Sequence, residues 1–297
     1  MQTPWGDFPV RDAHIHFFSH RFFSLLTGGR DVDAVARQLE WDAPAPDPGI
    51  LADRWVAELD RHGVASASLI ASMPSDEASV SAALSRYPDR FHGQFLVNPL
   101  APDTLERVAA AFHAGHRTVC LFPAMHRYSV ADERLEGLWP LAAGRNVFVH
   151  CGVLSVGVRK KLGLPSPFDM RYSNPLDLHN IALRHPSVRF VVPHFGAGFF
   201  REALMLAGLC PNVYLDTSSS NNWTRFNEVP LDLETVFRRA LDVAGEKRLL
   251  FGTDSSFFPR GWVQPVFSAQ VDVLQRIGIG RAGAEAILGG NLLSLQG

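Results

Sequence analysis

The segment Val10-Arg-Asp12-Ala-His14-Ile-His16 decides how the rest of the sequence is interpreted. Its apolar and β-branched residues predict a β-strand. Side chains alternate along a strand, so Asp12, His14 and His16 point to the same face. Two imidazoles on one face can bind the same metal ion. Similar segments, in which a short apolar run ends in a titratable residue, recur along the chain.

Eight such strands are predicted, separated by stretches in which apolar residues return every three or four positions. Those stretches predict helices, for example at 53–61, 104–114 and 176–184, each followed by a glycine or proline that ends a helix. Strands that alternate with helices run parallel, because each helix returns the chain to the same edge of the sheet. The predicted strands span 10–16, 64–71, 91–97, 117–122, 146–150, 188–194, 212–216 and 248–254.

Eight strand–helix units can close on themselves, and the sequence carries no glycine-rich phosphate loop of the kind that marks an open nucleotide-binding sheet. We therefore predict the α/β class, as a single (β/α)8 TIM barrel in which residues 1–297 form one domain. Two connections, 17–51 and 152–174, are unusually long and follow strand ends. They are predicted to rise from the C-terminal face as candidate lids.

The composition limits the kinds of partner. Lys and Arg number 28 against 30 Asp and Glu, a formal charge of -2, which speaks against binding of nucleic acid or an anionic membrane. The three cysteines are odd in number and widely spaced, which favours a reducing compartment over a disulfide framework. Residues 1–7 do not show the positive region followed by an apolar core that is typical of a signal peptide, and no later apolar run approaches about 20 residues. We expect a cytoplasmic protein.

Three further titratable residues stand at the ends of predicted strands: His150, His194 and Asp254. A barrel places its ligands and bases there. We predict that His14, His16, His150 and Asp254 bind one divalent metal ion, which activates water by lowering its pKa toward about 7. Asp254 is then the proton acceptor as well as a ligand, and His194 a catalytic partner that hydrogen-bonds the water or the developing oxyanion. For Asp12 we favour a structural or orienting role over ligation.

With these residues in place, the chain resembles the amidohydrolase superfamily, in the branch of amidohydrolase-2 proteins that contains aminocarboxymuconate-semialdehyde decarboxylase and related hydrolases. The resemblance implies an enzyme with one metal, commonly zinc and alternatively manganese, on the four ligands above, and a catalytic His194. It is also compatible with a homodimer. The motifs that carry it are Asp12-Ala-His14-Ile-His16, Phe148-Val-His150, Val192-Pro-His194-Phe-Gly196, Tyr214-Leu-Asp216-Thr-Ser, Phe251-Gly-Thr-Asp254 and Ile287-Leu-Gly-Gly-Asn291.

One departure from the family pattern concerns the number of metals. Where many relatives have a lysine at the fourth strand, this chain reads Gly115-His-Arg-Thr-Val-Cys120-Leu-Phe-Pro123. The lysine that some members carbamylate to bridge two metals is absent, so a mononuclear site is expected. Cys120 is interpreted as a buried structural thiol.

Two reactions remain open from the sequence. The first is metal-dependent hydrolysis of an ester, lactone or amide of a small organic acid. The alternative is non-oxidative decarboxylation of an unsaturated or aromatic acid, and a barrel that binds metal without catalysis is a third, less favoured, interpretation. A small-molecule carboxylate or ring compound is the expected substrate, bound by Arg260, Arg127 or Arg159, with Arg260 the first choice. Aromatic residues after strand ends can wall its pocket: Phe17, Phe18, Trp223, Phe257, Phe258 and Trp262.

Overall fold

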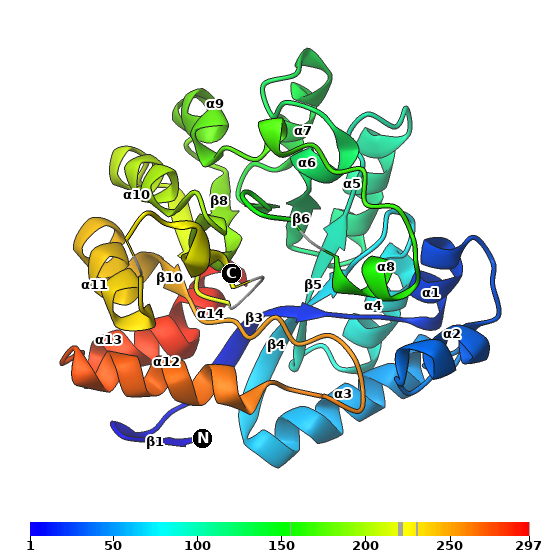
Figure 1. Ribbon diagram of the computed structural model, residues 1–297, viewed down its shortest axis with the longest axis horizontal. Coiled ribbons are helices and arrows are strands. Elements are labelled where there is room, and N and C mark those ends of the chain that lie inside the picture. Colours follow the sequence, from blue (N-terminus) through cyan, green and yellow to red (C-terminus); the bar gives the residue numbers. More distant parts are fainter. Residues whose placement is uncertain (155, 219–221, 230, 297) are drawn as a thin grey trace.

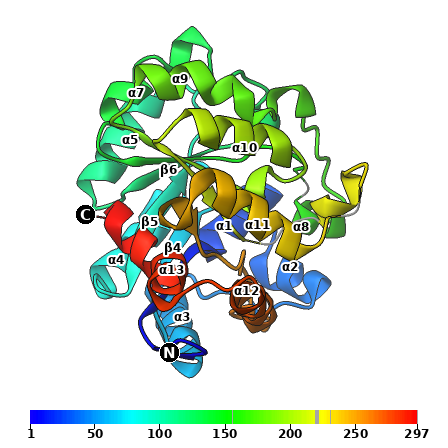
Figure 2. The same cartoon turned by 90° about the vertical axis from the view of Figure 1, so that its left-hand side faces the viewer.

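A computed structural model describes residues 1–154, 156–218, 222–229 and 231–296. Eight parallel strands stand side by side in the order β10-β9-β8-β7-β6-β5-β4-β3, with helices around them (Figures 1 and 2). A short antiparallel hairpin, β1 with β2, precedes the first barrel strand. Among the described helices, none combines the length and apolar character that a membrane crossing requires.

The strands of the described chain have the following bounds: β1 Gln2–Thr3, β2 Gly6–Asp7, β3 Val10–His16, β4 Val64–Ala71, β5 Phe91–Leu96, β6 Thr118–Leu121, β7 Asn146–Val149, β8 Arg189–Val192, β9 Val213–Asp216 and β10 Leu249–Leu250.

The helices are α1 His20–Thr27, α2 Val32–Leu39, α3 Pro48–His62, α4 Glu77–Arg86, α5 Thr104–His113, α6 Pro123–His126, α7 Leu138–Leu141, α8 Gly157–Lys161, α9 His179–Arg184, α10 Phe200–Leu209, α11 Leu233–Ala244, α12 Gln264–Arg276, α13 Arg281–Glu285 and α14 Asn291–Gln296. Short 3-10 turns lie between them, and α13 continues into α14 through a π-helical turn, Ala286–Gly290.

The sheet closes between β3 and the segment that follows β10. The Ala13 amide donates to the Phe251 carbonyl at 2.8 Å, the Asp254 amide to the His14 carbonyl at 3.0 Å, and the His16 amide to the Ser255 carbonyl at 2.7 Å. These bonds continue the parallel pairing past the end of β10. The predicted TIM barrel is confirmed.

The Asp12 carboxylate holds this closure together. One of its oxygens accepts the backbone N–H groups of His14, at 2.9 Å, and Thr253, at 3.1 Å. The other accepts the Thr253 hydroxyl at 2.5 Å and the Trp262 indole N–H at 2.8 Å. The side chain is fully buried, so these four donors replace the water that a carboxylate otherwise requires. Asp12 therefore has the structural surroundings that the sequence favoured for it.

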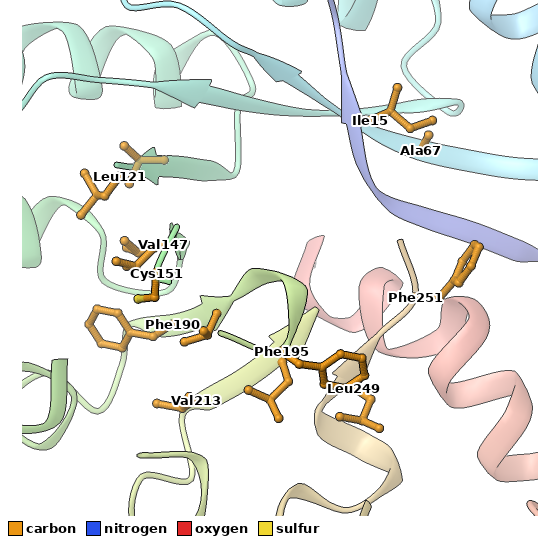
Figure 3. Packing of buried hydrophobic residues seen from close by; sticks show 14 of the residues in the cluster. Ile15, Ala67, Leu121, Val147, Cys151, Phe190, Phe195, Val213, Leu249 and Phe251 are labelled. Atoms are coloured by element: carbon orange, nitrogen blue, oxygen red, sulfur yellow. The ribbon is translucent and has the colours of Figure 1, made fainter. Parts of the chain in front are cut away.

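Two apolar layers pack on either side of the strands. Inside the barrel, seven of its eight strands each contribute one buried residue to a small cluster, which Leu292 and Leu295 of α14 close. A much larger cluster lies between the strands and the helices, and part of it is drawn in Figure 3. The inner residues are Ala13, Ile70, Leu96, Cys120, Phe148, Val191 and Leu250, with Tyr214 of β9 partly buried against them.

Several predicted bounds differ from the structure. Strands 10–16 and 64–71 have the predicted limits, whereas β8 and β10 end earlier than predicted. Both predicted lid connections contain helices: α1, α2 and the start of α3 in 17–51, and α8 in 152–174. The hairpin β1–β2 was not predicted. Helix 176–184 begins as a 3-10 turn, Pro175–Leu178, before α9.

Replacing Asp12 with alanine is expected to lower the free energy of unfolding by about 2–4 kcal/mol, because buried donors lose their acceptor. Urea denaturation followed by circular dichroism measures this change. Asp272, which is exposed on α12, provides the control: Asp272→Ala should change stability by less than about 0.5 kcal/mol. Equal effects of the two substitutions would contradict the role given to Asp12.

A second buried carboxylate predicts a pH dependence. Asp76 accepts the hydroxyls of Ser19, at 2.8 Å, and Ser79, at 2.5 Å, and burial raises its pKa from 3.8 to about 6. The folded chain therefore takes up a proton on Asp76 that the unfolded chain does not bind in this range, so the contribution of Asp76 to stability rises as the pH falls from about 6 toward 4. In Asp76→Asn this rise should be smaller, as measured by urea denaturation at pH 4.5, 5.5 and 7. Parallel stability–pH curves for the two proteins would contradict it.

Candidate metal centre and active site

Four histidines and Asp254 meet at the C-terminal end of the barrel. Potential ligand atoms of His14, His150 and His194 lie within 4.8 Å of one another, and so do those of His14, His16 and Asp254. His14 belongs to both groups and lies at their centre. The predicted ligand His150 is thus grouped with His194, which the sequence interpretation had placed beside the metal and not among its ligands.

His14 is oriented by a carboxylate that the sequence interpretation assigned no role. Its Nδ1 lies 2.6 Å from Asp216 Oδ2, and both side chains are fully buried. Since a carboxylate only accepts hydrogen bonds, Nδ1 carries the proton. The opposite nitrogen, Nε2, is buried and has no hydrogen-bond partner in the described part of the chain. Its lone pair is therefore free to bind an ion.

In His16, as in His14, Nε2 is the nitrogen available to an ion. Its Nδ1 lies 2.6 Å from the Ser72 hydroxyl, which donates its own proton to the Ile70 carbonyl and must accept from His16. Nε2 then carries a lone pair and lies 3.2 Å from Asp254 Oδ1. Without an ion, a proton on Nε2 would be donated to this carboxylate, and a cation bound by both atoms would take the place of that proton.

His194 and His150 complete the cluster. His194 Nδ1 lies 3.2 Å from the Ser218 carbonyl, an obligate acceptor, and 2.9 Å from the Ser218 hydroxyl, so the proton is on Nδ1 and Nε2 is unprotonated. His150 stacks on Phe122 with ring centroids 3.8 Å apart, and its buried Nδ1 has no hydrogen-bond partner among the described residues. Every histidine of the cluster therefore offers a nitrogen that the protein leaves unpaired.

The backbone is strained where the site is built. Asp254 has φ of 58° and His194 of 56°, in the left-handed region that non-glycine residues seldom adopt. Such strain persists only where surrounding contacts impose it, and it is frequent at functional sites. The backbone at residue 252 lies so close to His14 that only glycine fits there, because a Cβ at this position would lie 2.9 Å from the Cβ of His14.

Burial and neighbouring charge set the protonation of the cluster. Burial alone lowers the pKa of His14, but the charge and hydrogen bond of Asp216 outweigh it and raise that pKa. Burial also lowers the pKa of His150 and His194, which are neutral. For Asp254, burial alone raises the pKa, but the hydrogen bond with His16 outweighs it and holds the pKa of this carboxyl below its usual range, so the carboxylate is ionised.

This donor set fits a metal ion. It contains unpaired imidazole nitrogens, one ionised carboxylate and orienting partners behind His14, His16 and His194, an arrangement typical of zinc and related divalent ions. A single ion near His14 Nε2 would give that nitrogen a partner and would lie within reach of His16 and Asp254. Cys120 is buried with its thiol directed at the Gln94 side-chain oxygen, 3.4 Å away.

The three predicted substrate-binding arginines have different surroundings. Arg127 donates from Nε to the Pro167 carbonyl at 2.9 Å, and Arg159 donates to the Pro165 carbonyl at 2.6 and 2.9 Å. Both therefore fix the connection that follows β7. Arg260 instead donates to the Asp254 carbonyl at 2.8 Å, directly beside the cluster.

The aromatic residues predicted to line a pocket fall into two groups that differ in burial. Phe17, Trp223, Phe258 and Trp262 are buried. Phe18 and Phe257 remain half-buried and lie close to the cluster in the sequence, two residues beyond His16 and three beyond Asp254.

Sequence reasoning missed the partners that orient the histidines: Asp216, Ser218 and Ser72. For Asp216 a signal was present, because it ends strand β9 in the same way that Asp254 follows β10. Nothing in the sequence marks Ser72, and Ser218 was part of the motif Tyr214-Leu-Asp216-Thr-Ser without a role of its own.

The family model described as Amidohydrolase matches residues 12–291. The chain therefore belongs to the amidohydrolase family, and it is an enzyme of that family.

More particular likenesses come from one curated protein and from solved structures. The fluG protein of Emericella nidulans is 39% identical over 88 residues, which is 29% of this chain but only 10% of that protein. An amidohydrolase from Burkholderia multivorans with bound zinc has a TM-score of 0.63 and 18% identity, over 97% of this chain and 99% of that one. A Pseudomonas putida protein provisionally assigned as 2-pyrone-4,6-dicarboxylic acid hydrolase has a TM-score of 0.61 and 18% identity, over 98% of each chain. At these identities the solved structures support the fold alone.

The Asp216–His14 contact predicts a specific loss of metal affinity. Asp216→Asn keeps the side-chain shape but removes the charge that holds the proton on Nδ1, so zinc affinity should fall about 10–100-fold. Competition with a chromogenic chelator measures it. Asp272→Asn, on an exposed helix position, is the control and should bind zinc as the wild type does. Unchanged affinity in Asp216→Asn would contradict the orienting role.

Proposed function

We propose that this protein is a metal-dependent hydrolase that cleaves an ester, lactone or amide bond of a small organic acid. His14, His16, His150 and Asp254 would hold one divalent ion, with zinc as the first candidate. When bound, the ion supplies Lewis acidity, which polarises a carbonyl group and makes water a better nucleophile at neutral pH. The zinc in the Burkholderia multivorans amidohydrolase is consistent with this choice.

The observation that carries the proposal is the state of Asp254. Its side chain is 24% exposed, whereas His14, His150 and His194 are buried, and its carboxylate is ionised. Asp254 can therefore both bind the ion and accept a proton from an attacking water molecule. Hydrolysis needs a proton acceptor of this kind, and the likeness to the Pseudomonas putida protein provisionally assigned as a hydrolase supports hydrolysis over decarboxylation.

His194 has a complementary role. With its proton on Nδ1, directed at Ser218, its Nε2 accepts a hydrogen bond. It can thus orient the attacking water, and it cannot donate to an oxyanion until it has taken up a proton. The sequence interpretation left both possibilities open, and the Ser218 contact favours the first.

The experiment is a product assay on zinc-loaded protein. Lactones, esters and amides of small acids are compared with unsaturated and aromatic carboxylic acids, and acid release and CO2 are recorded for each. We expect acid release without CO2, and Asp254→Asn should lower kcat by about 10²–10⁴-fold. His14→Ala should lose the metal in elemental analysis, and Asp272→Asn should keep both metal and activity. Evolution of CO2 without hydrolysis would overturn the proposal in favour of a decarboxylase.

A further inference from the structure

Aromatic rings form a column beside the histidine cluster. Phe18, whose ring centroid is 5.6 Å from that of His16, stacks on Phe22 of α1 at 4.1 Å and 3°. Trp41 also lies nearly parallel to Phe18, with ring centroids 6.0 Å apart and an interplanar angle of 18°. Trp41 in turn stacks on Phe257 at 3.8 Å and 9°. The long connection 17–51 thus meets the segment after Asp254 through face-to-face rings.

The guanidinium of Arg260 lies at the end of this column. Its Cζ is 4.9 Å from the centroid of the Phe257 ring, within the range of a cation–π contact. One of its nitrogens, Nη2, donates to the Asp254 carbonyl at 2.8 Å and to the Ser256 hydroxyl at 3.2 Å. The ring and the two acceptors together define where the planar group lies.

Arg260 differs from its neighbours in having no carboxylate partner among the described residues. Arg54 makes a similar contact with a ring of the same segment, 3.9 Å from the centroid of Phe258, but it is paired with Asp42. Arg260 forms no such ion pair, and the interactions of Arg127 and Arg159 are with loop carbonyls. A preoriented guanidinium with unused donors is suited to bind a carboxylate.

The exposed parts of these aromatic rings determine which part of a substrate would lie next to a carboxylate bound by Arg260. Phe18, Trp41 and Phe257 are each only half-buried, although they pack on one another, and Phe18 and Trp41 also pack on the separate apolar cluster formed by α1, α2 and α8. Ring contacts therefore run from His16 to Arg260, and Lys161 Nζ lies 5.8 Å from the Trp41 ring centroid. An occupant held by Arg260 would lie next to the exposed parts of these rings.

We propose that Trp41 and Phe257 position Arg260 as a carboxylate-binding group at the mouth of the metal site, and that their rings select an acid with an apolar face next to its carboxylate. The inference rests on the proposed function, whose substrate class it narrows. Trp41 and Phe257 are positioning and selectivity residues, and Arg260 contacts the substrate.

The test uses three probes on the zinc-loaded protein: benzoate, propionate, and benzyl alcohol, which has the ring but no charge. Isothermal titration calorimetry should give the tightest binding for benzoate. Arg260→Gln should weaken both acids about tenfold and leave benzyl alcohol unchanged. Phe257→Ala should weaken propionate about threefold, because the guanidinium loses its ring, and the double variant should bind propionate no more weakly than Arg260→Gln alone.

Matched variants separate positioning from a general loss of structure. Arg54→Gln removes an arginine that also stacks on a ring nearby and should bind all three probes as the wild type does. Phe257→Tyr keeps a flat ring and should restore the affinity that Phe257→Ala loses, and zinc content is measured in every variant. Additive losses in the double variant, or benzoate binding that survives Arg260→Gln, would overturn the inference.

The two proposals can fail separately. If no ester, lactone or amide is cleaved but the probe pattern holds, the hydrolase proposal fails and the acid-binding subsite stands. If hydrolysis occurs and the probes bind Arg260→Gln as tightly as wild type, the subsite is wrong and the hydrolase proposal stands.

Discussion

The buried carboxylate of Asp12 joins the first barrel strand to the segment that follows the last one, and the remainder of the site depends on that junction. Its hydrogen bonds to His14 and Thr253 bring the backbone that carries two predicted ligands, His14 and Asp254, into register. The bond from the Trp262 indole fixes the end of the segment that carries Arg260. Closing the barrel and assembling the site are therefore the same structural event.

The sequence predicted the barrel well where local pattern and final structure agree. Strands 10–16 and 64–71 have the predicted limits, although their pairing shifts register between Val10 and Arg11 and between Asp12 and Ile15. The prediction failed at 188–194, where Pro193 cannot donate a ladder hydrogen bond and His194 adopts a left-handed backbone. It also failed at β10, whose regular pairing ends at Leu250 although the hydrogen bonds to β3 continue beyond it.

The candidate site, like the fold, was predictable only where local sequence pattern determines it. A period of two and the ends of strands identify His14, His16 and His150 without any knowledge of their neighbours. Contacts between residues that are far apart in the sequence produce no periodic pattern by which they could be predicted. The proton on Nδ1 of His14 depends on Asp216, 202 residues away, and the stacking of Trp41 on Phe257 joins two connections with no periodic pattern in common. The surroundings of Arg127 and Arg159 likewise depend on how a loop folds back.

The junction made by Asp12 also bears on how the chain is made. Asp12 and Thr253 are 241 residues apart, so the ribosome must synthesise nearly all of the barrel before the carboxylate can meet its partners. Contacts at such long range slow folding, and until they form, the first strand presents an unpaired edge to its surroundings. During most of its synthesis the nascent protein is therefore open to mispairing, and its predicted metal ligands come together only after the segment up to Trp262 has emerged.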